Sequence, residues 1–123
     1  MAKTAIDLTD EEIHSYSLIK HLPKWETEER REKALEIAKA IAKLLRKEFG
    51  ATKVVLFGSV LYSGRFSPWS DIDIAVYGIR ADQFYKAVAA SSEIAYDFHI
   101  DIVDPMDCHQ SLRKDIELNG IEL

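Results

Sequence analysis

Three acidic side chains in two β-like segments are the residues best suited to chemistry in this sequence. Asp71 and Asp73 stand two positions apart in the segment 71–77, and Asp101 stands in the segment 97–103. Residues two apart in a strand point to the same face, so Asp71 and Asp73 project together. Neighbouring carboxylates repel each other unless a cation lies between them, and Mg²⁺ favours one or two carboxylates plus substrate phosphates. The pair therefore predicts a metal that arrives with a phosphate.

A glycine–serine pair, Gly58-Ser59, follows directly after the apolar run 53–57. Glycine lets the backbone approach a ligand closely, and serine adds a hydroxyl group and a backbone N–H. A helical turn beginning at this point would add free N–H groups that bind an anion. We therefore expect a triphosphate to lie between Gly58-Ser59 and the acidic start of the next strand.

The third acidic residue, Asp101, lies in the middle of an apolar strand. Alternation in the segment 97–103 places Asp101 and His99 on one face, and we assign His99 no catalytic role. A carboxylate in a buried strand loses hydration, so Asp101 is predicted to complete a metal site and to accept the proton of an attacking hydroxyl. Asp104 competes for this role, but it precedes Pro105 and is better explained as a helix N-cap.

Structural explanations stand beside these assignments. Asp71 and Asp73 could be a polar strand end, Gly58-Ser59 a simple turn, and Asp101 the partner of a salt bridge. The aromatic residues of the loop 58–70 could stack on a base or pack the loop itself. They are Tyr62, Phe66 and Trp69.

The elements that must position these residues follow from the hydrophobic pattern. An apolar face at helical spacing predicts a long helix, and its charged face, with Arg30 and Arg31, is interpreted as solvated surface. Short apolar runs predict three strands. The expected elements are a helix at 28–48, strands at 53–57, 71–77 and 97–103, a helix at 80–92, and a last helix from Asp104-Pro105 to about Asn119-Gly120. This order predicts an α+β fold in which helices cover a short mixed sheet.

Composition limits the partners of this 123-residue chain. A formal net charge of −5 argues against a protein that neutralises the phosphates of a nucleic-acid polymer. The single cysteine, Cys108, allows neither an intramolecular disulfide nor a cysteine zinc site, which indicates a reducing cytoplasm. No segment approaches the roughly 20 apolar residues that span a bilayer, so we expect a cytoplasmic protein without a membrane partner.

The joined pattern resembles the DNA polymerase β-type nucleotidyltransferase superfamily. The resemblance rests on Gly58-Ser59, a loop, the acidic pair Asp71 and Asp73, and the later strand carboxylate Asp101. The small size resembles the minimal nucleotidyltransferase (MNT) branch, whose members are often the antitoxin half of HEPN–MNT toxin–antitoxin pairs. The resemblance covers roughly residues 30–123 and implies a polymerase β palm-like fold. We expect a nucleotidyltransferase domain at 27–123 after an N-terminal helical extension at 1–26, in which Thr9 and Glu12 have the spacing of a capping box.

The resemblance also implies a reaction. AMP would pass from ATP to a hydroxyl group, which in the toxin–antitoxin branch is a tyrosine hydroxyl of the partner HEPN toxin. Gly58 and Ser59 would hold the triphosphate, and Asp71, Asp73 and Asp101 would bind two Mg²⁺ ions. Asp101 would also activate the acceptor. Many members carry an arginine soon after the Gly-Ser pair; this chain does not, and either Arg65 reaches the phosphates instead or it is a solvated loop residue.

Two other functions stay open. The chain could be a non-catalytic antitoxin that neutralises its toxin by binding, or it could adenylylate a small molecule such as an aminoglycoside. Enzymes of the second kind resemble this core but carry an additional substrate domain, and the segments 1–26 and 104–123 are short for one. We therefore expect the acceptor pocket to come from a partner or a second copy, in a hetero- or homo-oligomer.

Overall fold

The computed structural model describes residues 24–123, so the short helix expected within 1–26, with its end near His21, lies outside the described residues. Two short 3-10 turns, η2 and η3, supplement the helices and strands. The elements, in chain order, are α2 (Lys24–Phe49), β1 (Lys53–Phe57), η2 (Ser59–Leu61), β2 (Ile72–Tyr77), α3 (Ala81–Ala95), β3 (Ile100–Val103), η3 (Pro105–Asp107), α4 (Gln110–Asn119) and β4 (Ile121–Glu122).

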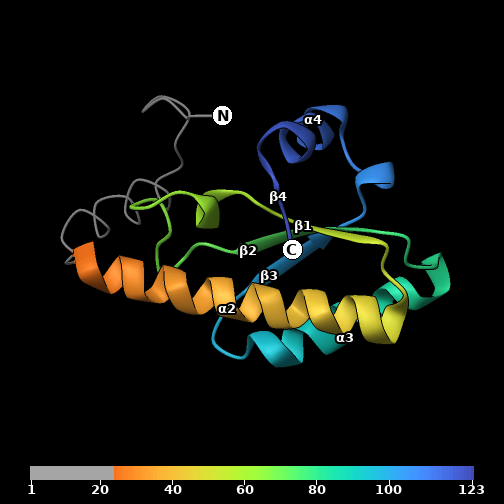
Figure 1. Cartoon of the computed structure of the whole chain (residues 1–123), viewed down its shortest axis with the longest axis horizontal. Helices are drawn as coiled ribbons and strands as arrows, with labels where there is room; N and C mark the ends of the chain where they lie inside the picture. Colours follow the sequence, from red (N-terminus) through yellow and green to blue (C-terminus); the bar gives the residue numbers. More distant parts are fainter. Residues whose placement is uncertain (1–23) are drawn as a thin grey trace.

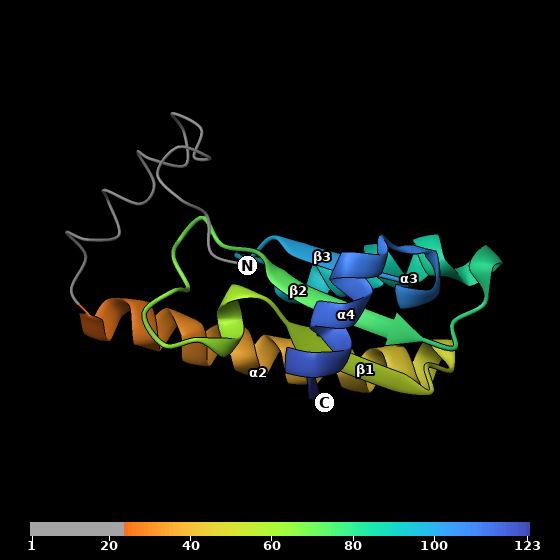
Figure 2. The same cartoon turned by 90° about the horizontal axis from the view of Figure 1, so that it is seen from above.

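The sheet is mixed and has helices on both faces. Its strand order is β3-β2-β1-β4; β1 runs antiparallel to β2 and β4, whereas β2 and β3 are parallel. Helices α2 and α3 cover one face, and α4 lies on the other (Figure 1). Viewed from above, α4 crosses over β1 and leaves part of its own face of the sheet uncovered (Figure 2). The predicted α+β fold with a short mixed sheet is therefore confirmed.

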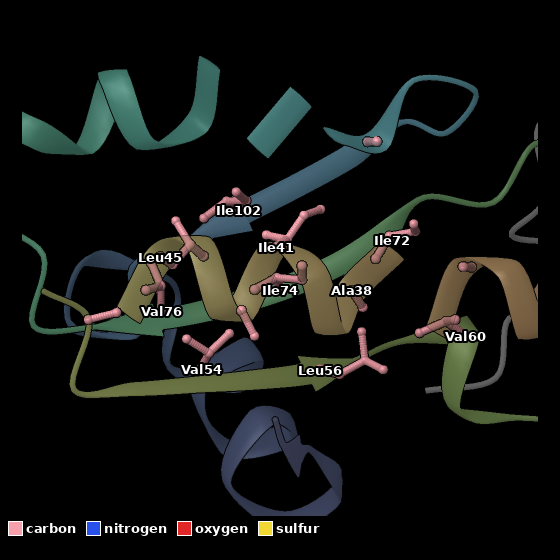
Figure 3. Packing of buried hydrophobic residues seen from close by; sticks show 14 of the residues in the cluster. Ala38, Ile41, Leu45, Val54, Leu56, Val60, Ile72, Ile74, Val76 and Ile102 are labelled. Atoms are coloured by element: carbon pink, nitrogen blue, oxygen red, sulfur yellow. The ribbon is translucent and has the colours of Figure 1, made fainter. Parts of the chain in front are cut away.

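The main core lies between the sheet and α2. Alternating residues of β2 point into it, and Ile72 and Ile74 are fully buried, as the sequence predicts for the face opposite the acidic pair. Figure 3 shows these side chains meeting those of α2. The residues labelled there are Ala38, Ile41, Leu45, Val54, Leu56, Val60, Ile72, Ile74, Val76 and Ile102. A smaller apolar cluster on the other face joins Val55, Phe57 and Ala75 to Ile116 of α4.

Some predicted boundaries were wrong. Helix α2 begins at Lys24 instead of residue 28, and β3 begins at Ile100, because a turn closed by the bond from Phe98 N to Ala95 O occupies the residues before it. The sheet also has a fourth strand, β4, whose two residues are too short to leave a pattern in the sequence.

The last predicted helix is divided. Asp104 caps η3, since its Oδ1 accepts a hydrogen bond from the backbone N–H of Met106 at 2.9 Å, and Pro105 takes the first position. The chain then extends at Cys108 and His109, and the His109 side chain caps α4. The N-cap predicted for Asp104 is thus confirmed, but two short helices replace one.

Across residues 24–123, every helix is either too short or too polar to cross a lipid bilayer.

Candidate active site

The three predicted carboxylates lie near one another, on the side of the sheet that α4 covers only in part. Asp73 of β2 and Asp101 of β3 are partners in the parallel register, which places their backbones about 4.8 Å apart. Each lies between isoleucines that point to the α2 side, so both acidic side chains point to the α4 side. Asp71 stands two positions before Asp73, just ahead of β2. Strand register thus brings together residues from two distant parts of the sequence.

Burial, and then repulsion from its neighbours, disfavour the charged form of the central carboxylate, Asp73. Burial first, and then the neighbouring charges of Asp101 and Asp71, raise the pKa of Asp73 from 3.8 to about 7. None of the three carboxylates accepts a hydrogen bond from, or forms an ion pair with, residues 28–123. Asp101 therefore has no salt-bridge partner there, and the mutual repulsion is left without compensation.

Gly58 fits tightly against this carboxylate group. Its φ of +83° lies in a region that residues with side chains rarely adopt. A Cβ atom built on Gly58 would overlap Asp73 Oδ2 and would lie 3.1 Å from Asp73 Cγ. Both the backbone conformation and the close approach of Asp73 therefore require glycine here, which places the Gly58 backbone next to the carboxylates.

A cavity of about 280 Å³ opens beside Gly58. One wall comes from the turn and loop after β1, and the other comes from the last turns of α4. The lining residues are Gly58, Ser59, Tyr62, Arg65, Asp115 and Asn119. The predicted helical turn begins at Ser59, as η2, so the Gly-Ser pair and the loop arginine face the same space.

The side chains of this cavity pair within each wall. The Arg65 guanidinium lies 4.9 Å from the centre of the Tyr62 ring, and Asn119 donates a hydrogen bond of 2.8 Å to Asp115. Sequence reasoning missed Asp115 and Asn119. Their only signal is a four-residue spacing on a helix, which ordinary surface helices share.

The other aromatic residues of the loop differ in their surroundings. Phe66 is fully buried and its ring centre lies 6.1 Å from that of Phe98, so it packs the loop against the core. Trp69 is half exposed, outside the core. Of the aromatic residues considered for base stacking, Tyr62 alone lines the cavity beside Gly58.

The acidic group fits a divalent cation that is completed by its substrate. Within residues 24–123, no three His, Cys, Asp or Glu side chains converge closely enough to form a complete metal-binding cage. Magnesium seldom occupies such cages; it binds one or two carboxylates and takes its other ligands from phosphates and water. Oxygen-only donors, uncompensated repulsion and an adjacent cavity match that requirement.

A larger cavity, of about 450 Å³, lies at the opposite ends of β2 and β3. Its walls include Phe84 of α3 and Cys108. None of the predicted site residues lines it, so size alone does not identify the site in this molecule.

Comparison with known proteins agrees with the geometry. No curated protein sequence matches the chain. The family model described as polymerase beta nucleotidyltransferase matches residues 39–123, which is more than half of the chain and includes the carboxylates and the Gly-Ser pair. Transferases of this family use divalent metal ions and nucleoside triphosphates. The chain therefore belongs to the polymerase beta nucleotidyltransferase family.

Proposed function

We propose that this nucleotidyltransferase transfers AMP from ATP to a tyrosine hydroxyl of a partner HEPN toxin and acts as its antitoxin. Family membership supports the class of reaction, and the small size and motif pattern support the MNT branch. The observation that carries the proposal is the in-register pairing of Asp73 with Asp101 beside the Gly58 backbone. This arrangement suits a site at which a phosphate chain and a hydroxyl group meet.

Each site residue has a role in this proposal. Asp71, Asp73 and Asp101 would hold two Mg²⁺ ions, which when bound neutralise phosphate charge at the attacking and leaving oxygens. The triphosphate would lie in the cavity beside Gly58, which Ser59 and Arg65 line. The Ser59 hydroxyl and the Arg65 guanidinium would donate hydrogen bonds to it. Positioning and charge neutralisation account for most of the catalysis in such reactions.

The transfer step is an in-line displacement at phosphorus. The acceptor hydroxyl oxygen forms a bond to the α-phosphorus of ATP, while the bond between that phosphorus and the bridging oxygen of pyrophosphate breaks. Pyrophosphate leaves, and the hydroxyl proton passes to a carboxylate oxygen of Asp101. The Asp101 side chain is exposed, not buried as its place in an apolar strand predicted, and it lies beside Asp73. An acceptor hydroxyl group can therefore reach it.

The position of Asp101 favours a large acceptor. It lies on β3, at one edge of the sheet, and no other strand within residues 24–123 pairs with the outer side of β3. A protein segment can therefore approach Asp101 from the edge without displacing a described element. An enclosed pocket for a small acceptor is not needed in this arrangement.

A labelling experiment tests the proposal. The protein is incubated with ATP labelled at the α-phosphate, Mg²⁺ and the toxin encoded by the neighbouring gene. We expect label on the toxin, lost in Asp101→Asn and when a tyrosine of the toxin is replaced by phenylalanine. Asp97→Asn is the matched control, because Asp97 is an exposed acidic residue of the same segment outside the carboxylate group.

Other outcomes would replace the proposal. Tight binding to the toxin without any label on it would show an antitoxin that acts by covering its target. Label on an aminoglycoside, with none on the toxin, would show a small-molecule adenylyltransferase.

A further inference from the structure

The N-terminal part of α2 holds the loop that follows Gly58-Ser59. Arg31 donates two hydrogen bonds to carbonyl groups of η2: Nε to Val60 O at 2.7 Å and Nη2 to Leu61 O at 3.2 Å. The Arg31 side chain is only 21% exposed. The charge pattern of the helix predicted a solvated position for Arg31, but its guanidinium is directed at the backbone of η2.

Glu28, one helical turn before Arg31, holds the next part of the same loop. Its Oε1 accepts hydrogen bonds from Ser63 Oγ at 2.5 Å and from the backbone N–H of Gly64 at 3.0 Å. Arg31 Nη1 lies 3.7 Å from Glu28 Oε2, so an ion pair joins the two side chains. Together they bond the backbone at Val60, Leu61 and Gly64 and the hydroxyl group of Ser63.

The Gly-Ser turn depends on such external contacts. Two backbone hydrogen bonds close η2. The Leu61 N–H donates to Gly58 O at 3.2 Å, and the Tyr62 N–H donates to Ser59 O at 3.1 Å. Carbonyl groups at the end of a helical turn have no partner inside it. Arg31 supplies partners for two of them through charge-assisted bonds, which are stronger than neutral ones.

We propose that Arg31 is a positioning residue for nucleotide binding: it fixes η2 so that Ser59, Tyr62 and Arg65 face the cavity beside Gly58. This inference rests on the proposed nucleotidyltransferase function. It concerns a part of α2 that precedes the segment matched by the family model, which begins at residue 39. The nucleotide site of this chain thus depends on side chains that lie outside its family core.

The geometry of the contact requires arginine. A planar guanidinium presents several N–H groups in a fixed fork and can reach two carbonyl oxygens at once. Lysine keeps the positive charge but offers a single point of contact on a flexible stem. Arg31→Lys should therefore keep only part of the ATP affinity that Arg31→Ala loses. If Arg31 acted through its positive charge alone, Arg31→Lys would keep all of it.

The test combines hydrogen exchange with ATP affinity in the full chain. In Arg31→Ala we expect faster amide exchange at Leu61 and Tyr62. We also expect roughly tenfold weaker binding of ATP in the presence of Mg²⁺, as for the loss of a charge-assisted hydrogen bond. The KM for ATP should rise more than kcat falls. The exchange rates and the ATP affinity of Arg31→Lys should lie between those of the wild-type protein and those of Arg31→Ala.

Arg46→Ala is the matched control. Arg46 lies on the same helix and also donates to carbonyl groups, Leu123 O at 2.6 Å and Thr52 O at 3.4 Å, but far from the Gly-Ser turn. The Arg46→Ala variant should be less stable than the wild-type protein, with no change in ATP affinity or in amide exchange at Leu61 and Tyr62. Thermal unfolding of each variant separates a local change in the loop from loss of the fold.

Two results would overturn the positioning role. One is an ATP affinity in Arg31→Ala within twofold of the wild-type value; the other is unchanged exchange at Leu61 and Tyr62. If the wild-type protein binds no ATP, the proposed function fails along with this inference. If ATP binding weakens as expected but no toxin is labelled, the acceptor is wrong and the positioning role stands.

Discussion

The two faces of the sheet differ in what their side chains contribute. On the α2 side, Ile72, Ile74 and Val76 are buried against helices with almost no exposed surface. On the α4 side, apolar packing stops at a small cluster around Ile116. Beyond it Asp73 and Asp101 lie side by side, without an ion-pair partner among residues 28–123.

The difference separates stability from chemistry within a single strand. The apolar face removes hydrocarbon from water, which is the main favourable term in folding. The acidic face does the opposite, since like charges held close together destabilise the native state. Asp73 and Ile74 are neighbours in β2, so replacing each in turn tests the separation at one point of the backbone.

Removal of the buried side chain should have the largest effect on stability. Ile74 is fully buried in the main core, and Ile74→Ala leaves a cavity between β2 and α2. We expect the free energy of unfolding to fall by about 2–5 kcal/mol. Urea denaturation measures this fall. An effect below roughly 1 kcal/mol would show that the α2 side is loosely packed, which would weaken the contrast between the faces.

The neighbouring acidic residue should show the reverse pattern. Asp73→Asn keeps the shape of the side chain but removes the charge beside Asp101. We expect transfer of label to fall by roughly a hundredfold or more, as when one preorganised electrostatic contact to a transition state is lost. The melting temperature in EDTA at pH 8 should stay the same or rise. A large loss of stability would mean that Asp73 supports the fold as well as the site.

The acidic face of the sheet should make the stability of the protein depend on pH. Burial, then Asp101 and then Asp71, raise the pKa of Asp73 from 3.8 to about 7. Between these values the native state keeps a proton that the unfolded state has released, so stability falls as pH rises from about 4 to about 7. The melting temperature of the wild-type protein in EDTA should therefore drop more between pH 5 and pH 8 than that of Asp73→Asn.

Adding Mg²⁺ should restore part of the stability that the protein loses as the pH rises. A divalent cation that binds the ionised carboxylates stabilises the native state by mass action, and the effect requires the deprotonated form. The rise in melting temperature on adding Mg²⁺ should be larger at pH 8 than at pH 5, and small in Asp73→Asn. Equal rises in both proteins would place the ion elsewhere.

The sequence predicts the acidic face well because the relevant rules are local. Alternation along a strand places Asp71 with Asp73, and it places Ile72 and Ile74 on the other side; the structure has this arrangement. Asp104 was correctly separated from the acidic group, because an aspartate before a proline is typical of a helix N-cap.

The features of the fold and the site that the sequence does not predict depend on contacts between distant segments. The register that pairs Asp73 with Asp101 leaves no signal in either strand alone, because it is set by how the two strands meet after α3. Arg31 bonds Val60 and Leu61, which follow it by 29 and 30 positions in the sequence. Nothing in the sequence near Arg31 distinguishes it from the exposed Lys33. The two-residue strand β4 has no pattern of its own and exists through its pairing with β1.

The smallest effect should come from the loop arginine at the edge of the acidic face. Arg65 is exposed, its guanidinium lies 4.9 Å from the Tyr62 ring centre, and it lines the cavity beside Gly58. We expect Arg65→Ala to weaken ATP binding by about three- to tenfold, since a solvent-exposed charge contributes little through screened electrostatics. Raising the salt concentration should reduce the difference between the two proteins. Isothermal titration calorimetry with a non-hydrolysable ATP analogue measures both changes.

Arg80→Ala is the control for that loss of charge. Arg80 is also exposed, pairs with Asp82, and precedes α3 at the other end of β2. If both variants lose the same affinity, the effect is one of overall charge on a chain of net charge −5. If Arg65→Ala alone weakens binding, the phosphates lie in the cavity between η2 and α4. The positive charge that the acidic face lacks in its own strands then comes from the loop beside it.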